Sequence, residues 1–142
     1  MRPRAAVVVA ALFFTLLSVV LTSPAHASGT CSGAASLPGW SVTVSKNPRS
    51  WSGNPVLDAG IQVQVLQNTS TGTKMIRFRN ISAVPRSPVN GSAYATPGGN
   101  EYGQTSTIVA GPDGGWCSDE APANTTIYGF LGYGNLFAGV SG

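Results

Sequence analysis

Residues 60–81 constrain the fold most, because strand patterning and turn composition agree there over two consecutive elements. Residues 61–65 read IQVQV, and farther along Ile76 and Phe78 alternate with arginines. Alternation with a period of two indicates strands with one buried face. The polar residues 68–73 between the two halves are of the types that turns favour. The sequence therefore predicts a β-hairpin that buries its aliphatic face and exposes its Gln and Arg side chains to water.

The rest of the chain also favours short strands. Apolar residues alternate with polar ones from Trp40 to Val44, and we expect further strands at 105–110 and on both sides of a turn within 125–140. Helices are disfavoured because no helical spacing extends over three turns after residue 27. Each glycine within 125–140 would also cost a helix about 1 kcal/mol. We predict an all-β domain, a small antiparallel β-sandwich, Ig-like or similar, of six to seven short strands.

Residues 82–104 interrupt this pattern with prolines and glycines and show no periodicity of their own. Connections of this length without regular structure are uncommon in a compact domain. We expect either a surface excursion or a binding loop, and the sequence does not decide whether it is ordered.

The first 27 residues have the features of a secretory signal peptide. Arg2 and Arg4 precede an apolar run over residues 5–21, and Ala25-His26-Ala27 follows as a cleavage motif. The run is also near the lower length limit of a membrane-spanning helix, but no basic stop-transfer cluster follows it. We expect cleavage after Ala27, a single secreted domain at 28–142, an extracellular location and no membrane association afterwards.

Charge argues against some classes of partner. The chain has eight basic and five acidic residues, and removal of Arg2 and Arg4 leaves a net charge of +1. Since the remaining charges are few and scattered, we expect no nucleic-acid partner.

Cys31 and Cys117 are the two cysteines of the chain. Exported proteins mature under oxidising conditions, so the sequence predicts one disulfide that encloses most of the domain. We expect no metal site and no cofactor, because two cysteines cannot form a zinc cage alone.

The available side chains also argue against an enzyme. The only histidine, His26, lies within the cleavage motif, which excludes Ser-His-Asp and Cys-His catalysis in the secreted domain. The acidic residues lie in sequences typical of turns, where carboxylates bond to the backbone. A carboxylate pair of the glycosidase type is the remaining alternative.

Aromatic residues in loop contexts are the main functional candidates. Trp51, Tyr94 and Tyr102 lie near Asn, Gln and Ser. Large aromatic surfaces with a polar rim suit a glycan, cell-wall material or a protein partner. Trp116 is a core candidate instead, because it precedes Cys117. The preferred hypothesis is a secreted non-catalytic binding module.

Two alternatives remain. Prolines on both sides of Arg86 and Ser87 favour an extended backbone, as a protease-inhibitory loop requires. The apolar C-terminal segment lacks Lys or Pro, so it could also pair with another chain in a self-associating surface protein. The oligomeric state stays open.

Overall fold

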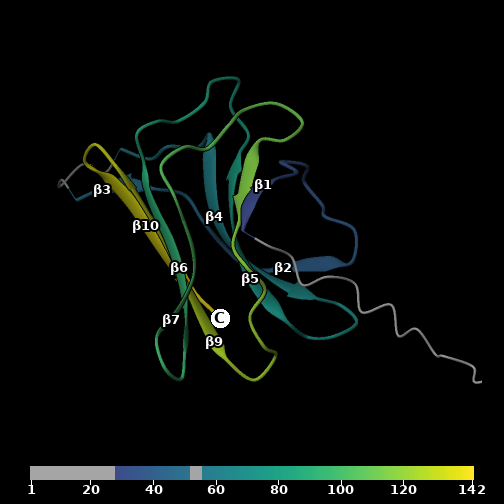
Figure 1. Ribbon diagram of the computed structural model, residues 1–142. Helices are drawn as coiled ribbons and strands as arrows, with labels where there is room; N and C mark the ends of the chain where they lie inside the picture. Colours follow the sequence, from purple (N-terminus) through teal and green to yellow (C-terminus); the bar gives the residue numbers. More distant parts are fainter. Residues whose placement is uncertain (1–27, 52–55) are drawn as a thin grey trace, which may run out of the picture.

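The computed structural model describes residues 28–51 and 56–142, and these form two antiparallel β-sheets of five strands each, with no helix (Figure 1). The first sheet has the strand order β1 (Gly29–Cys31), β8 (Gly115–Cys117), β5 (Lys74–Asn80), β4 (Ile61–Asn68), β2 (Trp40–Lys46). The second has the order β3 (Arg49–Ser50), β10 (Leu136–Ser141), β9 (Thr126–Tyr133), β6 (Asn90–Thr96), β7 (Asn100–Thr105). The described part of the chain contains no apolar helix of membrane-spanning length.

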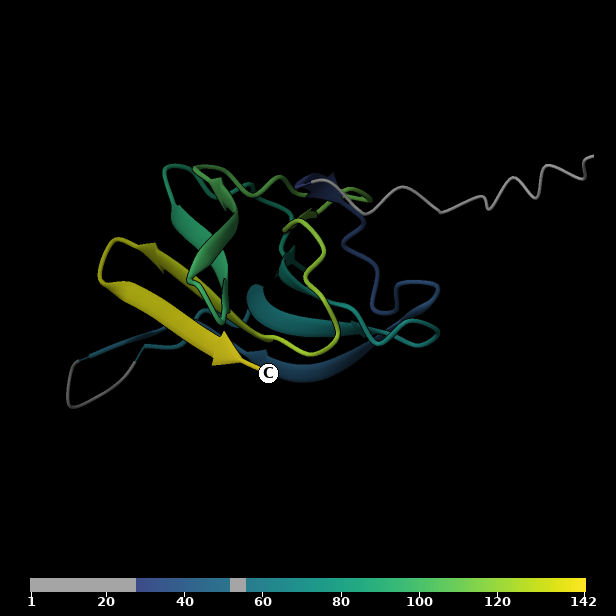
Figure 2. The same ribbon diagram turned by 60° about the horizontal axis from the view of Figure 1, so that its bottom comes forward.

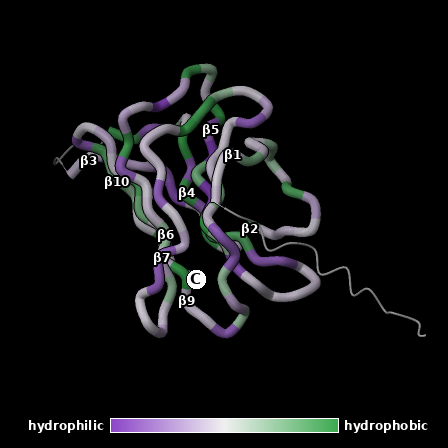
Figure 3. Tube along the Cα trace, in the orientation of Figure 1, coloured by the Kyte–Doolittle hydropathy of each residue, from purple (hydrophilic) through white to green (hydrophobic). Residues whose placement is uncertain are grey.

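The predicted β-hairpin is confirmed as β4 and β5. Val63 pairs with Phe78 and Val65 with Ile76, and all four side chains are buried. Hydrophobic and hydrophilic residues alternate along these strands in Figure 3. At the turn, the Asn68 side-chain oxygen accepts hydrogen bonds from the backbone N–H groups of Ser70 and Thr71. The polar turn sequence therefore acts as its composition indicates.

The expectation that the Gln and Arg face of this hairpin meets water is wrong. Arg77 is fully buried and Gln64 nearly so, because the segment between β1 and β2 covers this face. The Arg77 guanidinium donates to the carbonyls of Ser32 and Ala34, at 3.1 Å each, and to the side-chain oxygen of Gln64 at 2.9 Å. Burial, followed by the nearby charge of Arg79, lowers the pKa of Arg77.

Inward-facing side chains of both sheets form one hydrophobic cluster. Phe78 stacks on Trp116 within the first sheet, with ring centroids 5.1 Å apart, and Ile127 and Leu131 of β9 belong to the same cluster from the second sheet. Trp116 is 5% exposed, which confirms its place in the core. A smaller cluster on the other side of the first sheet contains Trp40 and the disulfide.

The strand pattern differs from the expected one in two places. Residues 82–104 contain two strands, β6 and β7, and are not an irregular connection. Within 105–110, where a strand was expected, Ile108 makes only an isolated bridge with Arg86. The described residues form ten strands, not six to seven, because β1, β3 and β8 are too short to produce a sequence pattern.

The predicted disulfide is confirmed. Cys31 of β1 and Cys117 of β8 are bonded across 86 positions of the sequence, with Cα atoms 5.8 Å apart, and the described residues contain no free cysteine.

Candidate functional site

The outer face of the second sheet carries most of the exposed aromatic side chains. Along β9, Ile127 and Leu131 point into the core, so Tyr128 and Phe130 point outward. Strand pairing sets Tyr94 of β6 opposite Tyr128, and it sets Phe137 of β10 opposite Gly132. Register alone thus brings aromatic residues from three strands onto one face.

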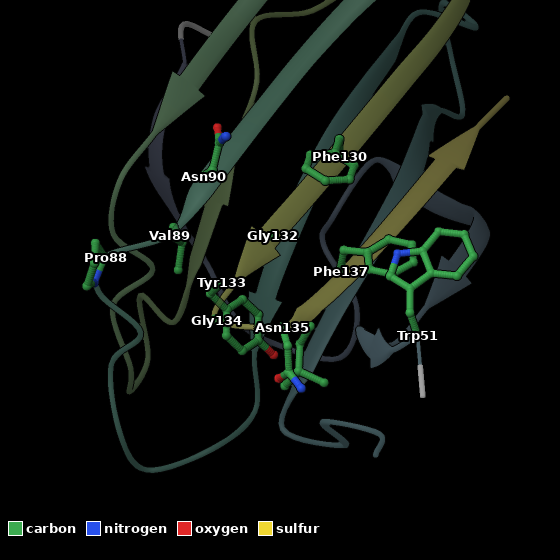
Figure 4. A pocket seen from close by; sticks show the side chains of 11 residues that line it. Trp51, Pro88, Val89, Asn90, Phe130, Gly132, Tyr133, Gly134, Asn135 and Phe137 are labelled. Atoms are coloured by element: carbon green, nitrogen blue, oxygen red, sulfur yellow. The ribbon is translucent and has the colours of Figure 1, made fainter. Parts of the chain in front are cut away.

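The rings on this face contact one another. Tyr94 stacks on Tyr128 with centroids 5.1 Å apart, Trp51 stacks on Phe137 at 4.6 Å, and Phe130 lies 6.4 Å from Phe137. Trp51 is 85% exposed, so one side of its indole rests on Phe137 and the other meets solvent. Figure 4 shows the Trp51 ring overlapping that of Phe137, with Phe130 on the neighbouring strand. We call the five residues Trp51, Tyr94, Tyr128, Phe130 and Phe137 the aromatic face.

Backbone pairing fixes the position of Trp51. The preceding strand, β3, pairs with β10, where Ser50 lies opposite Leu136 and Arg49 opposite Phe137. Ser50 is buried, and its backbone N–H donates to the carbonyl of Val56 at 2.9 Å. The indole therefore follows a strand that is anchored to the sheet.

A polar cluster lies at one end of the aromatic face. The Tyr133 hydroxyl donates to Oδ2 of Asp58 at 2.6 Å, the Arg86 guanidinium lies 3.4 Å from the same oxygen, and the backbone N–H of Gly60 donates to Oδ1. Burial opposes ionisation of Asp58, but these donors and the Arg86 charge outweigh it and lower its pKa. Burial, reinforced by the hydrogen bond to the carboxylate, strongly raises the pKa of Tyr133. The cluster joins three segments of the chain around one carboxylate.

An open hollow of about 760 Å³ extends from this cluster to Trp51 (Figure 4). Its lining combines the rings of Trp51, Phe130 and Phe137 with the side-chain amides of Asn90 and Asn135. Such a surface can stack on a flat ligand and hydrogen-bond to its rim.

The structure brings two of the sequence candidates together. Trp51 and Tyr94 both belong to the aromatic face. Tyr102 does not, because its half-buried side chain packs against the hydrophobic core. The face also contains three residues that sequence reasoning missed, namely Tyr128, Phe130 and Phe137. The sequence predicts strands within 125–140 but not which side chains share a face, although Tyr128-Gly129-Phe130 shows the alternation that separates the two faces.

Arg86 and Ser87 lie in a segment that is held at several points. Backbone groups of Arg86 and Ile108 exchange two hydrogen bonds of 2.9 Å, and the Arg86 side chain, 26% exposed, pairs with Asp58. The Ser87 hydroxyl lies 3.1 Å from that of Thr107.

Residues 28–51 and 56–142 contain no group of three or more His, Cys, Asp or Glu side chains placed to hold a metal ion. No protein-family model matches the sequence, and searches of curated proteins and of solved structures find no significant match.

Proposed function

We propose that the chain is a secreted, non-catalytic binding module of the β-sandwich type that recognises glycan or cell-wall material through the aromatic face. The observation that carries the proposal is the set of partly exposed rings on one face of the second sheet, with Trp51 85% exposed and stacked on Phe137. A sugar ring has an apolar C–H side, which suits stacking, and a rim of hydroxyl groups, which suits amides such as Asn90 and Asn135.

The length of the aromatic face favours a chain of sugars over a single one. Tyr128 and Gly132 lie four residues apart on β9, which corresponds to about 13 Å along a strand. Tyr94 stacks beside the first position and Phe137 lies opposite the second. A ligand that contacts both ends must therefore be longer than one sugar ring.

Secretion is part of the proposal. The Arg2 and Arg4 start, the apolar run and the Ala25-His26-Ala27 motif favour export. The Cys31–Cys117 disulfide is compatible with an extracellular protein.

The two alternatives gain no comparable support. An inhibitory loop needs a protruding residue, whereas the Arg86 side chain is paired with Asp58. Self-association through an apolar edge needs exposed apolar residues along the C-terminal strand, whereas β3 pairs with β10 at Leu136 and Phe137 and the exposed positions of the remainder are Gly139 and Ser141.

Retention on insoluble polysaccharides tests the proposal. Trp51→Ala and Tyr94→Ala each remove an exposed ring, one from each end of the face, and should reduce retention at least tenfold, about 1.4 kcal/mol. Val84→Ala is the control, because it removes a side chain that is also exposed but lies outside the face. Because each ring stacks on a neighbour, each ring variant should lose about 0.5 to 1.5 kcal/mol of unfolding free energy and stay folded, whereas Val84→Ala should change it by less than about 0.5 kcal/mol. Unchanged retention in both ring variants would refute the proposal.

A further inference from the structure

A second hollow, of about 540 Å³, adjoins the aromatic face and contains two cationic side chains. Lys46 ends β2 and Arg49 begins β3, so the short connection between the two sheets places both beside β10. Figure 2 shows β2 running alongside the C-terminal strand, although the two belong to different sheets. Both side chains belong to exposed residues.

This hollow is continuous with the aromatic face. Phe137 lines both it and the hollow beside Trp51. A third hollow, of about 260 Å³, is lined by Lys46 together with Tyr94, Tyr128 and Phe130. Lys46 therefore borders both ends of the ring system, and Arg49 is fixed to it through the pairing of its backbone with Phe137.

The charge of this surface is not balanced by the protein. None of the Asp and Glu residues that the structure describes lines any of the three hollows. The one ion pair among described residues joins Arg86 to Asp58, and it leaves Lys46 and Arg49 without a carboxylate partner. Asn47 lies between them in the sequence. Its side-chain amide donates to the backbone carbonyls of Asp58 and Ile61 and so keeps the connection in place.

We propose that the ligand of the aromatic face is an acidic glycan, whose carboxylate or sulfate groups bind Lys46 and Arg49 while its sugar rings stack on the aromatic side chains. This inference rests on the proposed function and narrows its ligand class. Arg49 can donate two parallel hydrogen bonds to an oxyanion, and Lys46 provides a mobile point charge. A polymer with regularly spaced acidic groups can contact both cations and both ring pairs at once.

Matched polymers test the ligand class. Polygalacturonate and its methyl ester share a backbone and differ in the carboxylate charge, and dextran sulfate and dextran differ in the same way for sulfate. We expect titration calorimetry to give at least tenfold tighter binding to one acidic polymer than to its neutral counterpart. The preference should shrink between roughly 0.05 and 0.5 M NaCl, since salt screens exposed charges.

Charge variants test the residues. The double variant Lys46→Gln/Arg49→Gln should lose the preference for the acidic polymer and leave binding to the neutral one unchanged. Lys74→Gln is the control for loss of a positive charge, because Lys74 lines none of the three hollows and donates to the carbonyl of Thr125. It is compared with the single variants Lys46→Gln and Arg49→Gln, which also remove one charge each. It removes one positive charge away from the hollows and should keep the preference.

The outcomes separate the two proposals. Equal binding of acidic and neutral polymers, with loss of both in Trp51→Ala, overturns the acidic ligand and leaves the glycan module standing. Acidic-polymer binding that needs Lys46 and Arg49 but not Trp51 overturns the combined site. No binding to any of the polymers, or sizing experiments in which the aromatic face pairs two copies of the chain, overturns this inference.

Discussion

At the residue scale, the Asp58 carboxylate holds residues 56–60 against the rest of the fold, through Tyr133 and Arg86. We predict that Tyr133→Phe lowers the free energy of unfolding by about 2 kcal/mol near neutral pH, because a hydrogen bond to a charged group is lost. The folded state raises the pKa of Tyr133, so this contribution is complete below the unfolded pKa of about 10 and is lost as the pH rises above it.

Urea unfolding of the native protein and of Tyr133→Phe between pH 7 and pH 11 measures this effect. The stability difference should be constant up to about pH 9 and shrink above about pH 10. On the acid side, the folded state lowers the pKa of Asp58 below its ordinary value of 3.8, so its contribution is lost below about pH 4. If the stability difference stays unchanged up to pH 11, the contribution of the Tyr133 hydroxyl to stability does not depend on its protonation, and the prediction is wrong.

Arg77 shows why single residues can mislead a sequence prediction. Alternation correctly places it on the face opposite Ile76 and Phe78, but the pattern does not reveal what covers that face. The cover is made of backbone carbonyls, at Ser32 and Ala34, which any residue could provide. A buried arginine was therefore indistinguishable from an exposed one.

At the element scale, two glycines set how closely the sheets approach. A Cβ atom at Gly129 of β9 would lie 2.6 Å from Ile76, and one at Gly91 of β6 would lie 2.6 Å from Phe78. We predict that Gly129→Ala destabilises the fold by about 1 to 3 kcal/mol, because the added methyl group forces the core side chains apart. Chemical denaturation of the purified variant measures this cost.

Gly139→Ala is the control at this scale. Gly139 lies on β10 opposite Phe130, and both residues face outward. A Cβ at Gly139 would have its nearest neighbour at 3.8 Å. Its substitution should change stability by less than about 0.5 kcal/mol. If Gly129→Ala and Gly139→Ala change the free energy of unfolding equally, the change comes from the backbone entropy of the chain, and not from the spacing between the sheets.

The same close approach explains which strands the sequence could predict. β4 and β5 alternate large aliphatic and polar residues, so their pattern is plain. The inward positions of β6 are Gly91, Ala93 and Ala95, which are small because they face the large side chains of the first sheet. Small residues give little hydrophobic contrast, and the sequence pattern therefore does not distinguish β6 from an irregular connection.

At the scale of the whole molecule, the composition predicts the all-β class and the cysteines predict the disulfide. The aromatic face could not be predicted in the same way. It depends on the register between β6, β9 and β10, which is set by contacts far apart in the sequence. The sequence singles out Trp51 and Tyr94 because their neighbours are typical of loops, although Tyr94 lies in β6, whereas Phe137 resembles any apolar strand residue until its strand is placed.

The disulfide is the covalent tie of this architecture, and it should determine the stability of the whole domain. It joins β1 to β8 and encloses the chain from β2 to β7. The 18 glycines increase the backbone entropy of the unfolded chain, which folding must overcome. A loop of 86 residues removes open conformations worth about 4 to 5 kcal/mol on the chain-entropy model.

We therefore predict that Cys31→Ser, or complete reduction of the native protein, lowers the melting temperature by well over 10 °C. This corresponds to a loss of about 3 kcal/mol in a domain of this size. Circular dichroism melts with and without reductant measure the shift, and thiol titration without denaturant should detect no free sulfhydryl in the native protein. In Cys31→Ser, reductant should change nothing further, since no bond remains to be broken. A melting temperature indifferent to reductant in the native protein would mean that packing between the two sheets is sufficient to hold the fold.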